Sequence, residues 1–404
     1  MTRWKATRLR RVCQINPPIP EFGALAEDEP ITFLPLEAIW PDALDVSRVT
    51  LPTQAASGYT RFLLGDILLP KITPTFEAAR VAIANGLAGT VGCGTTELHV
   101  LRPGPLLYSR FLFYVLRSWD FLREGKANMY GVAGQKRVPE RFIANYELRL
   151  PPLDEQRAIV PFLDEETAKI DILIAKKNRL IEGLQEEGTA LVDNAVTGSH
   201  SVPEELPAGW SLVRNKNLFE EVNEKPKLDM ELLTVSHLTG VTPRAEKQVY
   251  MFMAESFDDY KVCREGDLVI NTMWAWMGAA GVSKREGIVS PSYGVYRLRR
   301  DDQLHPQFLD YLIRSKYYVG LMDAHSEGVW SSRLRLYPDE FLRMLMPIPP
   351  ISIQYEIVQR LDAVLQGNRH LETKLSESIK VLLENRAALI TAAVTGQIDV
   401  TKSA

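Results

Sequence analysis

The chain contains 404 residues, which is more than one typical hydrophobic core organises, so two or three domains are expected. Its apolar fraction of 46% and its charged fraction of 24% are those of an ordinary globular protein. The net charge of −4 argues against a lone nucleic-acid binder, but it permits local basic patches or basic surface supplied by a partner.

Cysteine usage and hydropathy exclude further classes. The three cysteines, Cys13, Cys93 and Cys263, are odd in number and far apart, so neither a disulfide framework nor a zinc ribbon is predicted. The start of the chain is basic but lacks an apolar segment, and no run of about 18 apolar residues occurs, so we expect neither a secretory signal nor a membrane span. A reducing compartment, the cytoplasm, is the expected location.

In chain order, the first half predicts a globule over residues 1–150. Trp4 opens it in a basic segment, and short β-rich runs follow at 65–72 ("GDILLPKI") and 96–103 ("TELHVLRP"). The run "RFLFYVLRS" at 110–118 has a parallel in the second half. Short strands alternating with one or two helices indicate an α+β globule of ordinary domain size.

A long helix is predicted next, over residues 151–198. The phrase "PPLDEQRAIVPFLD" begins at Pro151, and a proline pair blocks backward extension of a helix. Pro161 lies two turns into this helix, where it should kink the helix or move its regular part downstream. Gly198 stands where a C-terminal cap is expected.

The second half repeats this order. A globule is predicted over residues 199–348, opened by Trp210, with β-rich runs at 266–272 and 293–300 and the run "QFLDYLIRS" at 307–315, which parallels 110–118. A second long helix is predicted over residues 349–404, where "PPISIQYEIVQRLD" parallels the first helix and Gly396 parallels Gly198.

The two long helices share one register and one apolar seam. At a constant offset of 198 residues, Gln156 matches Gln354 and Asp164 matches Asp362, which indicates a rigid element, because loops would have tolerated insertions. Apolar residues spaced by seven predict a narrow seam on one helix face. The seam consists of Leu163, Ile170, Leu184 and Leu191 in the first helix and of Leu361, Leu375, Leu382 and Leu389 in the second.

This ordered set of phrases resembles the specificity subunit of type I restriction–modification systems over essentially the whole chain. The phrase "LPPLDEQRAIVPFLD" carries most of the resemblance, although the second copy has Ile353 where the first has Glu155. The phrases "GDIL", "GDLV", "VSPSYGVYRL" and "AAVTGQID" are also similar to the family's text.

The resemblance implies an α+β chain of two target-recognition domains, each followed by a long helix, with the two helices packed as an antiparallel coiled coil. It implies that this chain is non-catalytic and that each domain reads one half of a bipartite, asymmetric target in double-stranded DNA. The implied protein partners are two modification subunits that methylate adenine with S-adenosylmethionine, and restriction subunits that use ATP and Mg²⁺. No cofactor is expected in this chain itself.

Polar loops before the long helices are the first candidates for DNA contact. Arg and Lys suit guanine edges or phosphates, whereas Gln and Asn suit adenine. The alternative is a solvated loop whose charges touch nothing. The candidates are Asn128, Tyr130, Gln135, Lys136 and Arg137 in the first loop and Ser331, Ser332, Arg333 and Arg335 in the second.

Segments that follow the two Gly-Asp phrases are the second candidates. The first segment supplies Lys71 and Thr73, and the second supplies Asn271, Thr272, Trp274 and Trp276. The two tryptophans can pack against bases or backbone, or they can form one face of a core strand, which is the interpretation we favour for both. The basic residues of the N-terminal segment either follow phosphates or belong to a disordered tail; they are Arg3, Lys5, Arg8, Arg10 and Arg11.

No pattern in the chain predicts catalysis. The phrase "INPPIP" at 15–20 lacks the aromatic residue of an adenine methyltransferase motif, and no cofactor-binding glycine loop accompanies it, so we interpret it as a turn. The six histidines show no metal-ligand spacing. We therefore predict a non-catalytic DNA-recognition subunit. The alternatives are the specificity subunit of a methylation-only complex, and a two-headed scaffold or inhibitor that does not read DNA.

Overall fold

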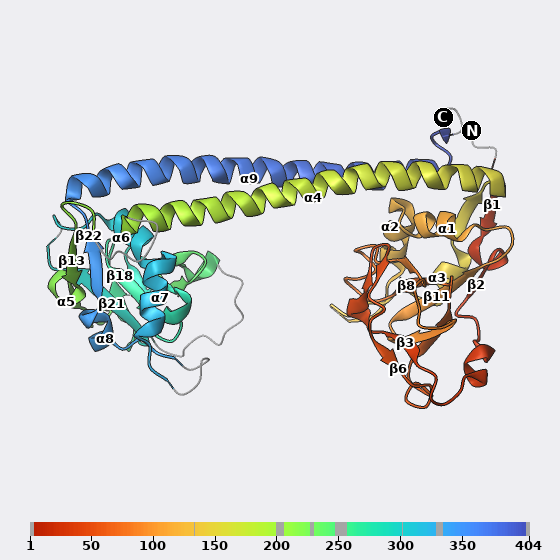
Figure 1. Cartoon of the computed structure of the whole chain (residues 1–404), viewed down its shortest axis with the longest axis horizontal. Coiled ribbons are helices and arrows are strands. Elements are labelled where there is room, and N and C mark those ends of the chain that lie inside the picture. Colours follow the sequence, from red (N-terminus) through yellow and green to blue (C-terminus); the bar gives the residue numbers. More distant parts are fainter. Residues whose placement is uncertain are drawn as a thin grey trace. The chain divides into compact units, whose positions relative to one another are not determined.

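The computed structural model describes residues 4–132, 134–198, 206–226, 230–246, 257–300, 302–328 and 334–400. The chain forms two compact units (Figure 1). Unit 1 comprises Met1–Lys177 and Ser376–Ala404, and unit 2 comprises Asn178–Leu375. Two long helices, α4 (Leu153–Thr197) and α9 (Ile351–Val394), contribute residues to both units.

The globule of unit 1 contains two four-stranded sheets and two strand pairs. One sheet has the order β2-β11-β8-β9 and the other the order β6-β3-β10-β7, in which only the β3–β10 pair is parallel. Strand β1 pairs with β12, and β4 pairs with β5. The strands are β1 (Lys5–Arg8), β2 (Cys13–Ile15), β3 (Ile31–Leu34), β4 (Ile39–Trp40), β5 (Ala43–Leu44), β6 (Val49–Thr50), β7 (Thr60–Leu63), β8 (Ile67–Pro70), β9 (Ala82–Ile83), β10 (Val91–Gly94), β11 (Leu98–Pro103) and β12 (Glu147–Leu150).

The globule of unit 2 has one four-stranded antiparallel sheet, in the order β14-β21-β18-β19, and three strand pairs, β13–β22, β15–β16 and β17–β20. The strands are β13 (Ser211–Arg214), β14 (Phe219–Glu221), β15 (Leu233–Ser236), β16 (Gly240–Pro243), β17 (Lys261–Cys263), β18 (Leu268–Asn271), β19 (Ala280–Val282), β20 (Gly287–Val289), β21 (Tyr293–Leu298) and β22 (Leu345–Ile348).

Short helices follow the sheets in the same order in both units. Unit 1 has α1 (Ser109–Leu116), α2 (Trp119–Asn128) and α3 (Glu140–Asn145). Unit 2 has α6 (Pro306–Ile313), α7 (Lys316–Ala324) and α8 (Pro338–Arg343), besides the single-turn α5 (Asn215–Leu218). The remaining turns are the 3-10 helices η1 (Leu9–Arg11), η2 (Pro20–Ala24), η3 (Leu36–Ala38), η4 (Arg244–Glu246) and η5 (Ala275–Met277). The repeated order confirms the α+β tandem repeat predicted from the sequence.

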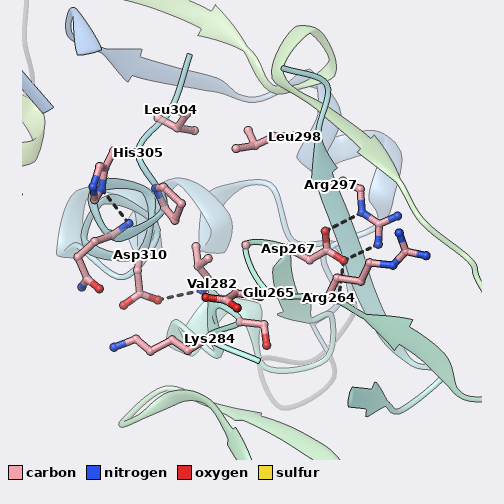
Figure 2. A pocket seen from close by; sticks show the side chains of 14 residues that line it. Arg264, Glu265, Asp267, Val282, Lys284, Arg297, Leu298, Leu304, His305 and Asp310 are labelled. Atoms are coloured by element: carbon pink, nitrogen blue, oxygen red, sulfur yellow. Dashed lines mark hydrogen bonds and ion pairs between the residues drawn. The ribbon is translucent and has the colours of Figure 1, made fainter. Parts of the chain in front are cut away.

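Both Gly-Asp phrases form the same turn, which joins a buried carboxylate to an arginine on the neighbouring strand. In unit 2, the Asp267 carboxylate accepts a hydrogen bond from the Arg264 N–H. It also forms a bidentate ion pair with the Arg297 guanidinium, at 2.8–2.9 Å (Figure 2). In unit 1, Asp66 accepts the N–H of Leu63 and the same pair from Arg102 at 2.7 Å. A two-pronged arginine–carboxylate pair fixes geometry as well as charge, so it holds the turn against the strand.

The long helices begin and end as the sequence predicts. Each begins at the residue after a proline pair, and Gly198 and Gly396 adopt left-handed backbone conformations with φ of 74° and 71°. The expectation that Pro161 moves the regular part of the first helix downstream is wrong. Helix α4 is already helical from Leu153 and continues through Pro161.

In unit 1, the beginning of α4 and the end of α9 cover one side of the globule. Ile159, Val160 and Leu163 share a buried cluster with Ile390, Ala393 and Val394, together with α1. Since Asp171 pairs with Arg386 while the earlier residues of α4 cluster with later residues of α9, the two segments run antiparallel.

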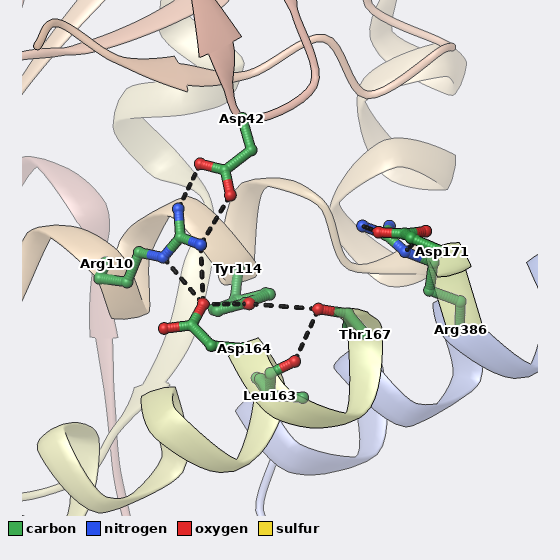
Figure 3. A network of polar contacts seen from close by, with 8 residues as sticks. All are labelled: Asp42, Arg110, Tyr114, Leu163, Asp164, Thr167, Asp171 and Arg386. Atoms are coloured by element: carbon green, nitrogen blue, oxygen red, sulfur yellow. Dashed lines mark hydrogen bonds and ion pairs between the residues drawn. The ribbon is translucent and has the colours of Figure 1, made fainter. Parts of the chain in front are cut away.

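A polar network attaches α4 to the globule of unit 1. Asp164 accepts hydrogen bonds from Arg110 at 2.7 Å and from the Tyr114 hydroxyl at 2.6 Å, and Arg110 also pairs with Asp42 (Figure 3). Burial, and then the nearby Asp164 carboxylate, raise the pKa of Tyr114 to about 12, so the hydroxyl stays a donor at neutral pH.

Unit 2 repeats this attachment with the roles of the helices exchanged. Leu361 at the beginning of α9 is buried with Val196 at the end of α4, and the Asn368 amide donates to the Leu184 carbonyl oxygen. The Tyr311 hydroxyl donates to Asp362, as Tyr114 does to Asp164. Among the seam residues, Leu163 and Leu361 are fully buried, whereas the others are partly buried; these are Ile170, Leu184, Leu191, Leu375, Leu382 and Leu389.

Candidate nucleic-acid interface

The first predicted loop closes as a hairpin at residues 130–137. The backbone N–H groups of Tyr130 and Arg137 donate to each other's carbonyl oxygens at 3.1 and 2.9 Å. Gly131 and Gly134 have φ values of 125° and 81°, which side-chain-bearing residues rarely adopt. The hairpin therefore closes through local backbone hydrogen bonds, and Tyr130, Gln135 and Lys136 are exposed on it.

The hairpin docks on the segment that follows strand β8, so the structure brings together the two candidate sets of the first globule. The Val138 N–H donates to the Lys71 carbonyl oxygen at 2.8 Å, and the Thr73 N–H donates to the Lys136 carbonyl oxygen at 2.9 Å. The Thr73 hydroxyl accepts the Lys136 N–H and donates to the Gly134 carbonyl oxygen, each at 3.1 Å. Thr73 thus holds the hairpin in place.

The side chains of the hairpin divide into free and engaged groups. Gln135 and Lys136 are exposed, and within the described part of the chain neither side chain has a hydrogen-bond or ion-pair partner. Tyr130 is 60% exposed. Asn128 is exposed at the end of α2, where its amide donates to the Glu124 carbonyl oxygen.

Arg137 is engaged with Glu97. Its guanidinium makes three contacts of 2.7 to 3.1 Å with the Glu97 carboxylate and one of 3.1 Å with the Gln135 carbonyl oxygen. The hydrogen bonds from Arg137 lower the pKa of Glu97, so the pair stays ionised at neutral pH. In this arrangement the arginine braces the hairpin, while Gln135 and Lys136 remain available to a ligand.

Beneath the hairpin, His99 connects it to the phrase "INPPIP". The His99 Nε2 atom lies 2.9 Å from the Val138 carbonyl oxygen, and Nδ1 lies 3.3 Å from the Asn16 amide nitrogen. Burial lowers the pKa of His99, so the neutral ring is favoured, with Nε2 as the donor. Asn16 also donates to Glu140 and accepts the Val100 N–H. The phrase forms a turn as expected, with Asn16 at a φ of 48°.

In unit 2, residues 327–335 have equivalent anchors. Glu327 and Arg335 exchange backbone hydrogen bonds of 2.9 Å, and the Leu336 N–H donates to the Thr272 carbonyl oxygen at 2.9 Å, as Val138 does to Lys71. Arg335 is exposed. The other candidates of this loop lie outside the described residues; they are Ser331, Ser332 and Arg333.

The candidates after β18 separate into buried and accessible residues. Asn271 and Thr272 are buried, and the Thr272 hydroxyl donates to the Ser292 carbonyl oxygen. The expectation that both tryptophans lie on a core strand is wrong. Strand β18 ends at Asn271, Trp274 is 49% exposed, and Trp276 lies in η5 with its ring stacked against Trp274, at a centroid distance of 6.4 Å.

The N-terminal basic segment is ordered from residue 4 onward, so the tail interpretation is wrong there; Lys5 and Arg8 lie in β1, whereas Arg10 and Arg11 lie in η1. Arg3 lies outside the described residues.

Glu97, His99 and Asn16 were not predicted as site residues. The strand run that contains Glu97 and His99 was recognisable in the sequence, but nothing local shows that it lies under the hairpin.

Among the described residues, no group of three or more His, Cys, Asp or Glu side chains could hold a metal ion. Over the same ranges, no helix has both the length and the hydropathy that crossing a membrane requires.

Comparisons with known proteins agree on one family. Residues 65–182 match the model of the type I restriction modification DNA specificity domain. The chain is 35% identical over 213 residues to the type I restriction enzyme EcoAI specificity subunit of Escherichia coli, a match that covers 52% of this chain and 35% of that subunit. It is 33% identical over 273 residues to the EcoEI specificity subunit of Escherichia coli, covering 66% of this chain and 45% of that subunit. The matches thus span less than half the length of these relatives.

Two solved structures share the fold. One is described as showing the structural basis of complex assembly and conformational transition of the type I R-M system; it has a TM-score of 0.74 at 19% identity and 98% coverage of both chains. The other is the HsdS subunit from Thermoanaerobacter tengcongensis, with a TM-score of 0.54 at 19% identity, covering 98% of this chain and 97% of that one. Both curated relatives are described as specificity subunits. The chain is therefore similar to specificity subunits of type I restriction enzymes, and its residues 65–182 match the DNA specificity domain model of that family.

Proposed function

We propose that this chain is the sequence-specific DNA-binding subunit of a type I restriction–modification complex and that it reads a bipartite, asymmetric target. The observation that carries the proposal is the repeated anchoring of a polar loop on the segment after β8 and after β18, through Val138 to Lys71 and Leu336 to Thr272. The first globule thus presents its loop on a rigid sheet, and the described ends of the second loop, Glu327 and Arg335, are anchored in the same way.

The side chains left free by these anchors suit base and backbone recognition. Gln135 offers both a donor and an acceptor and can pair with an adenine edge in the major groove, and Lys136 suits a phosphate or a guanine edge. In the second globule, Arg335 and the stacked pair Trp274 and Trp276 are accessible. Because the two sets differ chemically, the two half-sites should differ in sequence.

The proposed partners are two modification subunits that methylate adenine with S-adenosylmethionine, and restriction subunits that use ATP and Mg²⁺. The net charge of −4 supports such partners, since a duplex carries dense negative charge and other basic surfaces must neutralise part of it. This chain itself would hold no cofactor. Its place of action would be the cytoplasm, where the DNA of a bacterial cell lies.

Methylation mapping tests the proposal. The host methylome should contain one bipartite adenine-methylated sequence that disappears when the gene for this chain is deleted. Exchanging residues 1–150 for the corresponding globule of a relative should then change one half-site and leave the other unchanged. An unchanged methylome after deletion would refute DNA reading, and a change in both half-sites would refute independent reading by the two globules. Methylation without restriction of unmodified DNA would indicate a methylation-only complex.

A further inference from the structure

A groove of about 710 Å³ opens on the first globule next to the hairpin. We call it the proline groove. Residues 16–20, which contain three prolines, form one wall, and β7 with the preceding Tyr59 forms another. Lys71, at the point where the hairpin docks, also lines it, together with Leu98 and Val100 of β11. The groove and the hairpin therefore meet at Lys71.

The charges that line the proline groove have one sign. Arg61 and Lys71 are its charged groups, and no carboxylate is among the described residues that line it. Within the described ranges, the Lys71 ammonium has no hydrogen-bond or ion-pair partner, although the side chain is partly buried. The Arg61 guanidinium donates to the Ala56 carbonyl oxygen and lies 3.7 Å from the centroid of the Phe22 ring, so it too keeps its charge unneutralised.

Two acids close to the lining residues are already engaged, whereas Glu21, which follows Pro20, is exposed. Glu97 lies close enough for Lys71 to affect its titration, but its carboxylate is paired with Arg137. Glu140 accepts the amide of Asn16. In an otherwise acidic chain, a concave surface with two uncompensated cations is suited to an anion that comes from outside.

We propose that the proline groove holds the phosphodiester backbone of one DNA strand beside the bases that the hairpin contacts. Lys71 and Arg61 would pair with phosphate oxygens, and Tyr59, which is 44% exposed and braced edge-on by Phe33, would lie against the sugar. This inference rests on the proposed function and adds a phosphate-binding site to it.

Because Lys71 connects the groove to the hairpin, a phosphate bound in the groove would set the register of the protein along the DNA. The backbone of Lys71 accepts the Val138 N–H at the base of the hairpin, while its side chain lines the groove. A phosphate bound in the groove is therefore held at a fixed offset from Gln135 and Lys136. Phosphate contacts of this kind position a protein on the duplex, whereas base contacts supply the sequence preference.

The salt dependence of DNA binding tests this site. The full-length chain is titrated with a fluorescent 30-base-pair duplex of mixed sequence at several salt concentrations. The variant Arg61→Gln with Lys71→Gln should lower the slope of log K against log salt by about two, because each lost phosphate contact removes about 0.9. The control variant, Lys169→Gln with Lys176→Gln on α4, removes the same charge elsewhere in unit 1 and should keep the wild-type slope.

The salt slopes of the groove variant and of the control decide whether the groove binds phosphate. A wild-type slope in the groove variant, or an equal loss in the control, would overturn the groove as a phosphate site. If the wild-type chain bound no duplex even together with its modification subunits, the proposed function itself would be wrong. Circular dichroism melting verifies the fold, and Lys71→Met, which keeps the aliphatic stem, should lower the slope by about one even if the double variant does not fold.

Discussion

Gln156 and Gln354, 198 residues apart, make the same three hydrogen bonds. The Gln156 side chain accepts the Tyr108 N–H at 2.8 Å and donates to the carbonyl oxygens of Leu106 and Pro151 at 3.0 and 2.9 Å. Gln354 accepts the His305 N–H at 2.7 Å and donates to Gln303 and Pro349 at 3.0 and 2.9 Å. Each glutamine is fully buried and joins the first turn of a long helix to the residue that precedes α1 or α6.

Replacing either glutamine should destabilise the unit that contains it. Gln156→Ala leaves three backbone groups without their side-chain partner, among them the buried Pro151 carbonyl oxygen, so we expect a loss of about 1–3 kcal/mol in the free energy of unfolding. Gln354→Ala should do the same in unit 2. Urea denaturation measures the effect, with Gln185→Ala at an exposed position of α4 as the control. A loss below about 0.5 kcal/mol would show that the hydrogen bonds do not hold the helix to the globule.

The Gly-Asp turns should tolerate loss of the ion pair as a whole better than loss of one partner. Asp66→Ala removes a buried carboxylate, leaving the Arg102 guanidinium and the Leu63 N–H without their acceptor, so we expect about 2–3 kcal/mol of destabilisation. Adding Arg102→Leu should restore part of that loss. Thermal melting compares the single and double variants; an additive loss in the double variant would contradict coupling of the two groups.

Glu97 should affect DNA affinity indirectly, by holding the hairpin in place. Glu97→Gln weakens the ion pair by which Arg137 braces the hairpin. The backbone amide hydrogens of Val138 and Lys136, which dock the hairpin, should therefore exchange with solvent faster. DNA affinity should fall while the salt slope stays close to that of the wild type, since no phosphate contact is lost. Hydrogen exchange with mass spectrometry, together with the salt titration, measures both quantities.

A conservative control separates bracing from direct contact. Glu97→Asp keeps the charge and should recover most of the protection from exchange. If Glu97→Gln lowered the salt slope as strongly as the groove variant does, Arg137 would be a phosphate contact rather than a brace.

His99 should make the first globule less stable in mild acid. Burial lowers its pKa below the ordinary value of 6.5, with Lys71 acting in the same direction and Glu140 and Glu97 opposing it. Because the unfolded chain binds the proton more readily, the contribution of His99 is complete above pH 6.5 and is lost as the pH falls through the lowered pKa. Melting temperatures at pH 7.5 and 5.0 should therefore differ more for the wild type than for His99→Gln. An equal difference in both would show that His99 does not titrate in this way.

Local patterns in the sequence are enough to predict several parts of this protein. The proline pairs set the beginnings of α4 and α9, and Gly198 and Gly396 set their ends, because ring sterics and left-handed backbone conformation act within a few residues. The constant offset of 198 predicted the repeat, and alternating short strands with short helices predicted the α+β class. Of the two effects expected of Pro161, the downstream shift of the regular helix does not occur, since α4 is helical from Leu153 onward.

Contacts between distant segments determine which side chains are free to bind a ligand. Arg137 and Gln135 look equally suited to DNA in the sequence, but Glu97, 40 residues earlier, engages the arginine and leaves the glutamine exposed. Lys71 lines an acid-free groove only because β7, β8 and residues 16–20 meet there. Such partnerships arise from strand pairing between distant segments, and no local periodicity encodes them. The candidate interface therefore depends on contacts between strands that lie far apart in the sequence.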